Sequence, residues 1–209
     1  MRSPLAIARL TAPAVALVCL TLAAPALATQ KLSYNYGTVG YVGSGDIVGV
    51  SAYSSGQINR NWRTTGEYRY TDDDATATAD VKAHTGFLSL GYMVRTLPRA
   101  DILLDAGMFF THVRAEFATG GNAKGNDAGM FGSLGFRWII GERWEVEPRV
   151  RYYHTLEDSG DGWDIGLTGR YYLMENLGVY VSIEDSDFWN ETLFQLGLRF
   201  GEQRDLQNF

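Results

Sequence analysis

Polar and apolar side chains alternate with a period of two residues along most of the chain. From Trp144 to Tyr153 the even positions carry Trp, Val, Pro, Val and Tyr, whereas the odd positions carry Glu, Glu, Arg, Arg and Tyr. The same division recurs at 62–70, 163–173 and 192–200. A period of two places alternate residues on opposite faces of a β-strand, but scatters them around a helix. The pattern therefore predicts amphipathic β-strands.

Clusters of Gly, Asp and Asn divide this patterned region into segments. Most segments have the about 9 to 11 residues, or a few more, that a tilted strand needs to cross a bilayer. We expect ten strands, at 32–43, 46–57, 62–71, 82–95, 100–117, 127–140, 143–156, 162–173, 177–186 and 191–200.

The connections between these strands are of two kinds. Those after even-numbered strands are brief, at 58–61, 96–99, 141–142 and 174–176. Most of those after odd-numbered strands are longer and acidic, at 72–80, 118–126, 157–161 and 185–190, although the first, 43–45, is short. Outer-membrane β-barrels have short periplasmic turns and longer outer loops. We therefore expect the acidic loops outside and both termini on the periplasmic side.

The first 28 residues have the pattern of a cleaved secretory signal peptide. Arg2 and Arg9 form a basic start, residues 10–24 are apolar, and Ala26-Leu27-Ala28 has small residues at the cleavage positions. We expect three segments: a signal peptide at 1–28, a barrel at 29–200 and a short periplasmic tail at 201–209.

Cys19, the only cysteine, lies within the signal segment, so the mature chain has no thiol for a disulfide or a thiolate metal site. Val18 stands before it, where a lipoprotein signal needs a small residue, so lipid anchoring is not expected.

The charge balance argues against nucleic acid as a partner. Removing Arg2 and Arg9 from the 18 basic residues leaves 16 against 24 acidic residues, a formal net charge of −8. After the signal segment no apolar run approaches the about 18 residues of a membrane-spanning helix. Because only helices and closed barrels satisfy their backbone groups in lipid, we expect an all-β fold. It is a transmembrane antiparallel up-and-down β-barrel of about ten strands, with eight as the alternative.

Aromatic residues gather near both ends of the expected strands. One set is Tyr34, Tyr36, Trp62, Trp138, Trp144 and Tyr172, and the other is Tyr70, Phe110, Tyr152 and Trp163. Two such sets predict aromatic girdles at the two membrane interfaces. A soluble barrel is the alternative, but its interior would be apolar, whereas several strands here carry charge on one face.

The mature start Leu32-Ser33-Tyr34-Asn35-Tyr36, the pairs Gly91-Tyr92 and Gly135-Phe136, and the closing segment 194–200 resemble porin-family small outer-membrane β-barrel proteins. Within that group the chain is similar to the OmpA/OmpX type and to ten-stranded surface proteins of proteobacteria. The resemblance implies the outer membrane of a Gram-negative bacterium.

It also implies insertion by the barrel-assembly machinery, which reads a final strand of alternating apolar residues that ends in an aromatic. That signal falls on Phe194, Leu196, Leu198 and Phe200. Nine residues follow Phe200, and the last of them is Phe209, so that the tail carrying the signal is the alternative. Glu202, Arg204 and Asp205 favour a periplasmic tail.

The polar faces of the strands predict a charged lumen. Seven cations and six anions are expected to point inward: Arg63, Glu67, Arg69, Asp105, Arg137, Glu145, Glu147, Arg149, Arg151, Asp164, Arg170, Glu184 and Arg199. A barrel of this size is only slightly wider than side chains can fill, and Arg and carboxylate groups can pair across it. We interpret the set as a structural ion-pair network. A narrow diffusion channel for small ions or solutes is the alternative.

The outer loops offer weak candidates for other chemistry. Residues 158–162 (Asp-Ser-Gly-Asp-Gly) supply oxygen atoms but lack the spacing and terminal Glu of a calcium loop. Solvated loops are expected, with weak divalent-cation bridging to lipopolysaccharide as the alternative. His84, His112 and His154 each lie near an outer strand end. None has the His-x-Ser arrangement of lipid A deacylases, and catalysis needs a nucleophile, a base and an acid that converge.

We therefore expect a monomeric protein with a structural or surface-interaction role. It is not expected to be an enzyme or to hold a cofactor or metal, and an outer-membrane enzyme acting on lipid A or peptides is the third interpretation. The expected partners are outer-membrane lipid, lipopolysaccharide and, during insertion, the barrel-assembly machinery.

Overall fold

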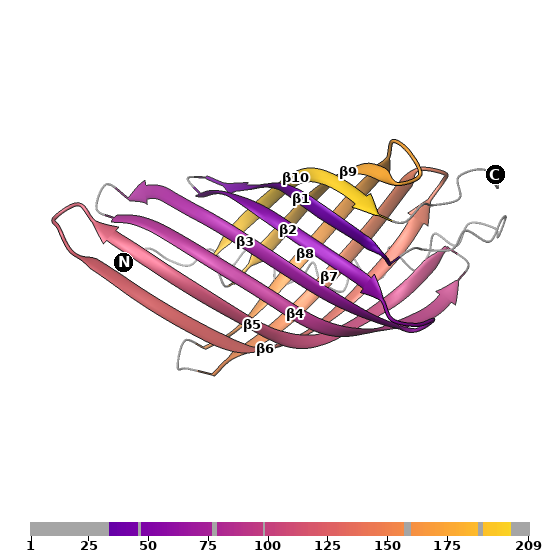
Figure 1. The fold of residues 1–209 in the computed structure, drawn as a ribbon, viewed down its shortest axis with the longest axis horizontal. Coiled ribbons are helices and arrows are strands. Elements are labelled where there is room, and N and C mark those ends of the chain that lie inside the picture. Colours follow the sequence, from indigo (N-terminus) through magenta and orange to yellow (C-terminus); the bar gives the residue numbers. More distant parts are fainter. Residues whose placement is uncertain are drawn as a thin grey trace, which may run out of the picture.

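The computed structural model describes residues 34–45, 47–76, 79–97, 99–156, 160–187 and 190–201. They form one closed barrel in which each strand pairs antiparallel with its neighbours in sequence and the first strand pairs with the last (Figure 1). The strands are β1 (Tyr36–Ser44), β2 (Ile47–Gln57), β3 (Trp62–Thr76), β4 (Ala79–Leu97), β5 (Ala100–Phe117), β6 (Asn122–Ile140), β7 (Trp144–Thr155), β8 (Asp161–Tyr172), β9 (Leu177–Ser186) and β10 (Glu191–Gly201).

The all-β, up-and-down barrel of ten strands is confirmed, and the alternative of eight strands is wrong. None of the described residues belongs to a helix that could cross a membrane. The expected signal peptide at 1–28, the mature start at 29–33, residues 157–159 of an acidic loop, and tail residues 202–209 lie outside the described residues. We call the end that carries the connections after odd-numbered strands the outer end, and the opposite end the inner end.

Side chains alternate between the lumen and the outer wall on every strand. On β10 the outward residues are Phe194, Leu196, Leu198 and Phe200, which are 47 to 60% exposed, whereas Arg199 between them is 2% exposed. Large apolar side chains are exposed on all ten strands, and buried charged side chains lie inside. A soluble barrel has the reverse arrangement. The wall is therefore built to face lipid.

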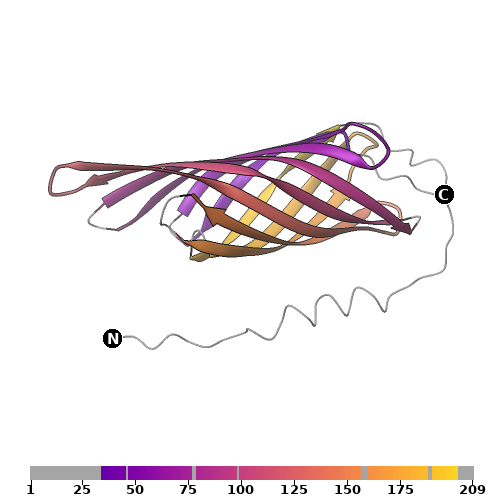
Figure 2. The same ribbon diagram turned by 90° about the horizontal axis from the view of Figure 1, so that it is seen from below.

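The strands from β3 to β6 are longer than the other strands. They have 15, 19, 18 and 19 residues, whereas the other six strands have 9 to 12. The hairpins β3–β4 and β5–β6 therefore project from the outer end as a one-sided wall, and β5–β6 extends furthest (Figures 1 and 2).

This projecting wall corrects the expected loops at 72–80 and 118–126. Asp72 pairs with Lys82 and Asp73 with Val81, and Asn122 already pairs with Glu116. Backbone pairing continues where the apolar alternation stops, because beyond the membrane neither face of a strand must be apolar. The sequence pattern therefore marks the end of the lipid-facing segment and not the end of the strand.

Three of the expected girdle tyrosines lie inside the barrel instead. Tyr34, Tyr36 and Tyr172 are 0 to 4% exposed. Tyr34 donates a hydrogen bond to Asp101 and Tyr172 donates one to Glu145, so their hydroxyls satisfy buried carboxylates. Outward aromatic residues do occur at both ends, among them Trp62, Trp144, Phe110 and Trp163.

Two apolar clusters also occupy the lumen. The inner one consists of Tyr34, Met93, Leu103 and Ile139. The other lies nearer the outer end and consists of Phe87, Phe109, Phe131 and Tyr153. The ionic side chains lie between and around these clusters, so that the interior of the barrel is filled by layers of different chemistry.

Candidate functional site

All thirteen charged residues expected in the lumen lie on inward positions of their strands. Twelve of their side chains are at most 9% exposed, and only Arg149, at 25%, is more accessible to water. Burial of this degree requires that neighbouring side chains fill the cross-section of the barrel around them.

Some of the ion pairs nearer the outer end join strands that are not neighbours in the sheet. Arg69 on β3 contacts Glu67 on the same strand and Glu184 on β9. Arg151 on β7 lies 2.9 Å from Glu67 and 3.5 Å from Asp164, measured between guanidinium nitrogen and carboxylate oxygen. Because β3 is adjacent to neither β7 nor β9, the pairs Arg69–Glu184 and Arg151–Glu67 cross the lumen.

Arg149 completes this outer group. Its Nη2 lies 3.4 Å from Glu184 Oε2. Asp164 also accepts a hydrogen bond from the Ser186 hydroxyl. Three arginines therefore share three carboxylates, and the group is electrically neutral.

A second group lies towards the inner end and is centred on Glu145. Its two carboxylate oxygens accept hydrogen bonds from Arg137, Arg170 and the Tyr172 hydroxyl, at 2.7 to 2.8 Å. Arg170 also donates to Glu147 at 2.8 Å. Removing one partner of such a buried pair costs more than the pair contributes, because the remaining charge stays in a poorly solvated site.

Tyrosine rings cover the guanidinium groups at the inner end. The guanidinium carbon of Arg199 lies 4.3 Å from the ring centre of Tyr36 and 4.8 Å from that of Tyr172. The guanidinium carbon of Arg137 lies 4.6 Å from the ring centre of Tyr34. Desolvated cation–π contacts of this kind contribute about 2 kcal/mol each.

Arg63 and Asp105 form a third, separate pair. Two guanidinium nitrogens of Arg63 donate to Asp105, the shortest distance being 2.8 Å, and the Ser133 hydroxyl donates to the same carboxylate. Gly91 leaves room for this pair, because a Cβ at that position would lie 2.1 Å from Asp105 Oδ1.

Sequence reasoning missed Asp101, which is 3% exposed and accepts the hydrogen bond from Tyr34. Arg95 lies 3.7 Å from the same carboxylate. The sequence pattern does indicate it, since Asp101 and Asp105 are four positions apart on one strand and therefore point to the same face. It was not recognised because Tyr34 was assigned to the membrane interface.

The three histidines lie on the outward face near the outer end. Tyr68 and His84 are joined by a hydrogen bond, and the ring centres of His84 and His112 are 6.3 Å apart. His154 lies on another part of the wall, with its Nδ1 2.5 Å from Asp161 Oδ1. Tyr152 also donates a hydrogen bond to Asp161, which stands at the outer end of β8.

The acidic residues of the outer end are held by local hydrogen bonds. Lys82 donates to Asp80, and Asp187 accepts from the backbone N–H of Trp163. Asp158 and Ser159 of the candidate calcium segment lie outside the described residues. Across the residues that are described, no three His, Cys, Asp or Glu side chains form a group that could hold a metal ion.

The candidate assembly strand is β10. Its outward residues Phe194, Leu196, Leu198 and Phe200 form a continuous apolar face, and β10 closes the barrel by pairing with β1 from Gly43↔Phe194 to Tyr36↔Gly201.

No protein-family model and no curated protein sequence matches the chain. Among solved structures, it is similar to Neisserial surface protein A, with 12% identity, coverage of 81% of this chain and 96% of that chain, and a TM-score of 0.46. It is also similar to Ail of Yersinia pestis, with 10% identity, coverage of 80% and 100%, and a TM-score of 0.45. The outer membrane protein OprG from Pseudomonas aeruginosa has 13% identity, coverage of 80% and 95%, and a TM-score of 0.41.

The three structures have TM-scores below 0.5 to this chain. Their identities of 10 to 13% carry no residue-level correspondence. The role of this chain is therefore argued from its own strand pairing and side chains.

Proposed function

We propose that the chain is an outer-membrane β-barrel with a filled lumen, and that it acts at the cell surface by binding an extended polypeptide along β6. One observation carries the surface role. β6 pairs with β7 only from Gly129↔Thr155 onward, so that residues 122–126 pair with β5 on one side and, among the residues that the structure describes, with no strand on the other. We call residues 122–126 the free edge.

The free edge presents backbone groups of alternate residues. Ala128 O accepts a hydrogen bond from Leu156 N on the β7 side, whereas Gly121 O accepts one from Phe117 N on the β5 side. The N–H and C=O groups of even-numbered residues in this segment therefore point away from β5, in the plane of the sheet. An exposed edge with unpaired backbone groups is a template for strand addition.

The composition of the free edge suits an added strand. It contains Gly125, Ala123 and Asn side chains and no proline, so that neither bulk nor a missing N–H blocks approach. The Asp127 carboxylate accepts the N–H of Ala128 and so ends the edge. Lys124 stands on the outward face in the middle. The favoured partner is an extended segment that alternates acidic and small apolar residues, with an acidic side chain opposite Lys124.

A synthetic peptide of alternating glutamate and valine provides the probe. We expect saturable binding of the fluorescent peptide to the barrel in phosphatidylcholine vesicles, measured by anisotropy at low salt. Lys124→Pro removes an N–H that faces the free edge but leaves the bonds to β5 in place, and should abolish binding. Lys124→Ala, the matched control, removes only the charge and should weaken it. Equal binding to the proline variant, or none to the unchanged protein, would contradict the surface role.

Location in the outer membrane is tested separately. The apolar outer wall and the short inner turns support this assignment. We expect the protein in the outer-membrane fraction, with different gel mobility in unheated and boiled samples, because a closed barrel resists detergent. Loss of that mobility difference in membrane-extracted protein would contradict it.

A narrow diffusion channel is the second candidate, and the water-accessible side chain of Arg149 in the lumen favours it. The burial of the other twelve charged residues supports a filled lumen instead. Planar-bilayer recording separates the two, since a filled lumen predicts a silent protein and a channel predicts steady discrete openings.

That the chain is not an enzyme and holds no cofactor stays a prediction. If it were an enzyme acting on lipid A or peptides, alanine substitution of His84, His112 and His154 should abolish that activity.

A further inference from the structure

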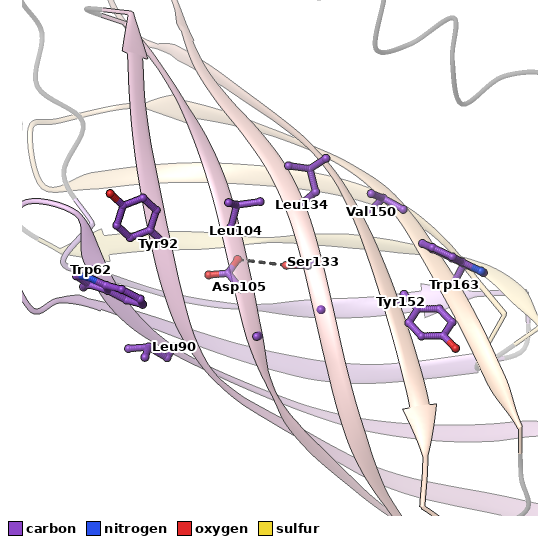
Figure 3. Close-up of a pocket in the computed structure, with 12 residues that line it drawn as sticks. Trp62, Leu90, Tyr92, Leu104, Asp105, Ser133, Leu134, Val150, Tyr152 and Trp163 are labelled. Atoms are coloured by element: carbon purple, nitrogen blue, oxygen red, sulfur yellow. Dashed lines mark hydrogen bonds between the residues drawn. The ribbon is translucent and has the colours of Figure 1, made fainter.

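A groove of about 580 Å³ lies on the outward face of the barrel, across strands β3 to β8 (Figure 3). This volume is within the range of about 300 to 1,000 Å³ that is usual for small-molecule sites. Its sides are formed by outward apolar side chains, among them Leu90, Leu104, Leu134 and Val150. Of the thirteen charged residues of the lumen, only Asp105 also lines this groove.

Small residues form the floor of the groove. Ala106 on β5 and Gly132 on β6 are cross-strand partners, and both line the groove. The floor has room at Gly132, because a Cβ there would have only the Asp105 carbonyl oxygen nearby, at 3.9 Å. Asp105 and Ser133 also line it, but their side chains are hydrogen-bonded to each other (Figure 3).

The groove is enclosed by the lipid-facing belt of the barrel. One row further towards the outer end, β4, β5 and β6 carry Leu88, Met108 and Met130, which are 59 to 65% exposed. An apolar chain that lies in the groove is therefore in contact with side chains on its floor and its sides, and with membrane lipid elsewhere. The continuity with the lipid-facing wall identifies the occupant as part of a lipid and not as a water-soluble molecule.

Aromatic pairs stand at both ends of the groove. Trp62 and Tyr92 have ring centres 5.0 Å apart, and Tyr152 and Trp163 have ring centres 4.8 Å apart. The second pair leads to polar groups near the outer end of the wall. Tyr152 donates a hydrogen bond to Asp161 at 2.6 Å.

His154 contacts the same carboxylate of Asp161. Tyr152, His154 and Asp161 thus place a hydroxyl, an imidazole and a carboxylate at the outer end of β7 and β8, beside an aromatic ring. Such a combination can bind the hydroxyls of a sugar headgroup.

We infer that this groove holds one acyl chain of an outer-leaflet glycolipid of the lipid A type, with the sugar at Tyr152, His154 and Asp161. The inference rests on the proposed membrane location of the barrel. Removal of acyl methylenes from water is favourable, but in a membrane that gain is shared by all lipids. Selectivity therefore comes from the shape of the floor and from the polar end.

The test fills the floor with apolar side chains that suit a lipid-facing strand. We propose the variant Ala106→Leu/Gly132→Leu, with Gly169→Leu as the matched control. Gly169 lies on the outward positions of β8, where a Cβ meets nothing within 4 Å, and it does not line the groove. The full-length chain is extracted from outer membranes with mild detergent and examined by native mass spectrometry. Gel mobility before and after heating first establishes that each variant is a folded barrel.

We expect an adduct with the mass of an acylated disaccharide phosphate on the unchanged protein and on Gly169→Leu, reduced at least about fivefold on the filled variant. A folded, membrane-inserted protein without this adduct, or with an equal adduct on the filled variant, overturns the inference while leaving the proposed function intact. An adduct with the mass of a glycerophospholipid overturns the assignment to the outer leaflet. Failure of the unchanged protein to insert would instead contradict the proposed function.

Vesicles provide a second measurement that does not depend on extraction. The protein is refolded with phosphatidylcholine that contains a small fraction of lipid A with brominated acyl chains, which quench nearby tryptophan. The contribution of Trp163 is obtained by comparison with Trp163→Phe. Quenching of Trp163 above that caused by brominated phosphatidylcholine at the same fraction supports the inference, and equal quenching overturns it.

Discussion

The carboxylate of Glu67 on β3 lies 2.9 Å from the guanidinium of Arg151 on β7, across the interior of the barrel. The two residues are 84 positions apart in sequence, and neither strand is a neighbour of the other. Pairs of this kind brace the wall from within, which a barrel without an apolar core requires.

Loss of the Glu67 charge should destabilise the barrel. In Glu67→Gln, Arg151 and Arg69 each lose one carboxylate partner in a buried site, and we expect the free energy of unfolding to fall by about 3 kcal/mol. Urea titration in lipid vesicles measures it. Glu116→Gln is the control, because the Glu116–Arg114 pair is about half exposed and should contribute less than about 1 kcal/mol. Equal effects of the two substitutions would show that the lumen is well hydrated.

Phe109 and Phe110 are neighbours on β5 that test whether the lumen or the outer wall is the packed core of the protein. Phe109 is 2% exposed in the aromatic cluster of the lumen, whereas Phe110 is 51% exposed on the outer wall. Phe109→Ala should cost about 3 to 5 kcal/mol of unfolding free energy, because it leaves a cavity. Phe110→Ala leaves none and should cost clearly less. A larger loss for Phe110 in the same urea titration would reverse the assignment of the two faces.

Gly107 should not tolerate a side chain. A Cβ there would lie 2.0 Å from the carbonyl oxygen of Leu88 on the neighbouring strand. Gly107→Ala must therefore displace backbone in a closed sheet, and we expect a loss of about 1 to 3 kcal/mol, typical of overpacking. At Gly169, where no atom lies within 4 Å, the same substitution should be close to neutral. Their unfolding midpoints in urea give the comparison.

The free edge should show alternating amide exchange. The amide protons of Asn122, Lys124 and Asn126 point away from β5, whereas those of Ala123, Gly125 and Asp127 point towards it. In deuterated water we expect the first three to exchange faster by NMR, because only the others are hydrogen-bonded within the hairpin. Equal protection of both sets would mean that the edge is covered, and equally fast exchange would mean that the hairpin opens.

The sequence by itself determined the strands and the faces of this protein. The period of two, interrupted by Gly, Asp and Asn, predicted ten strands whose positions agree with the structure to within a few residues over most of the barrel. It also assigned all thirteen charged residues to the lumen. Each strand alternates apolar and polar residues because one face contacts lipid, and this alternation can be read from the local sequence alone.

Only the tertiary structure decided which charges meet. Closure of the barrel brings Glu67 to Arg151 and Arg69 to Glu184, and no local pattern carries that information. It also moved Tyr34, Tyr36 and Tyr172 from the expected interface to the lumen, since an aromatic residue near a strand end fits either place until its hydrogen-bond partner is known. The free edge arises because β7 pairs with β6 only from Thr155, opposite Gly129, whereas β6 already pairs with β5 from Asn122 onward. Such an edge is a relation between strands that no single sequence segment contains.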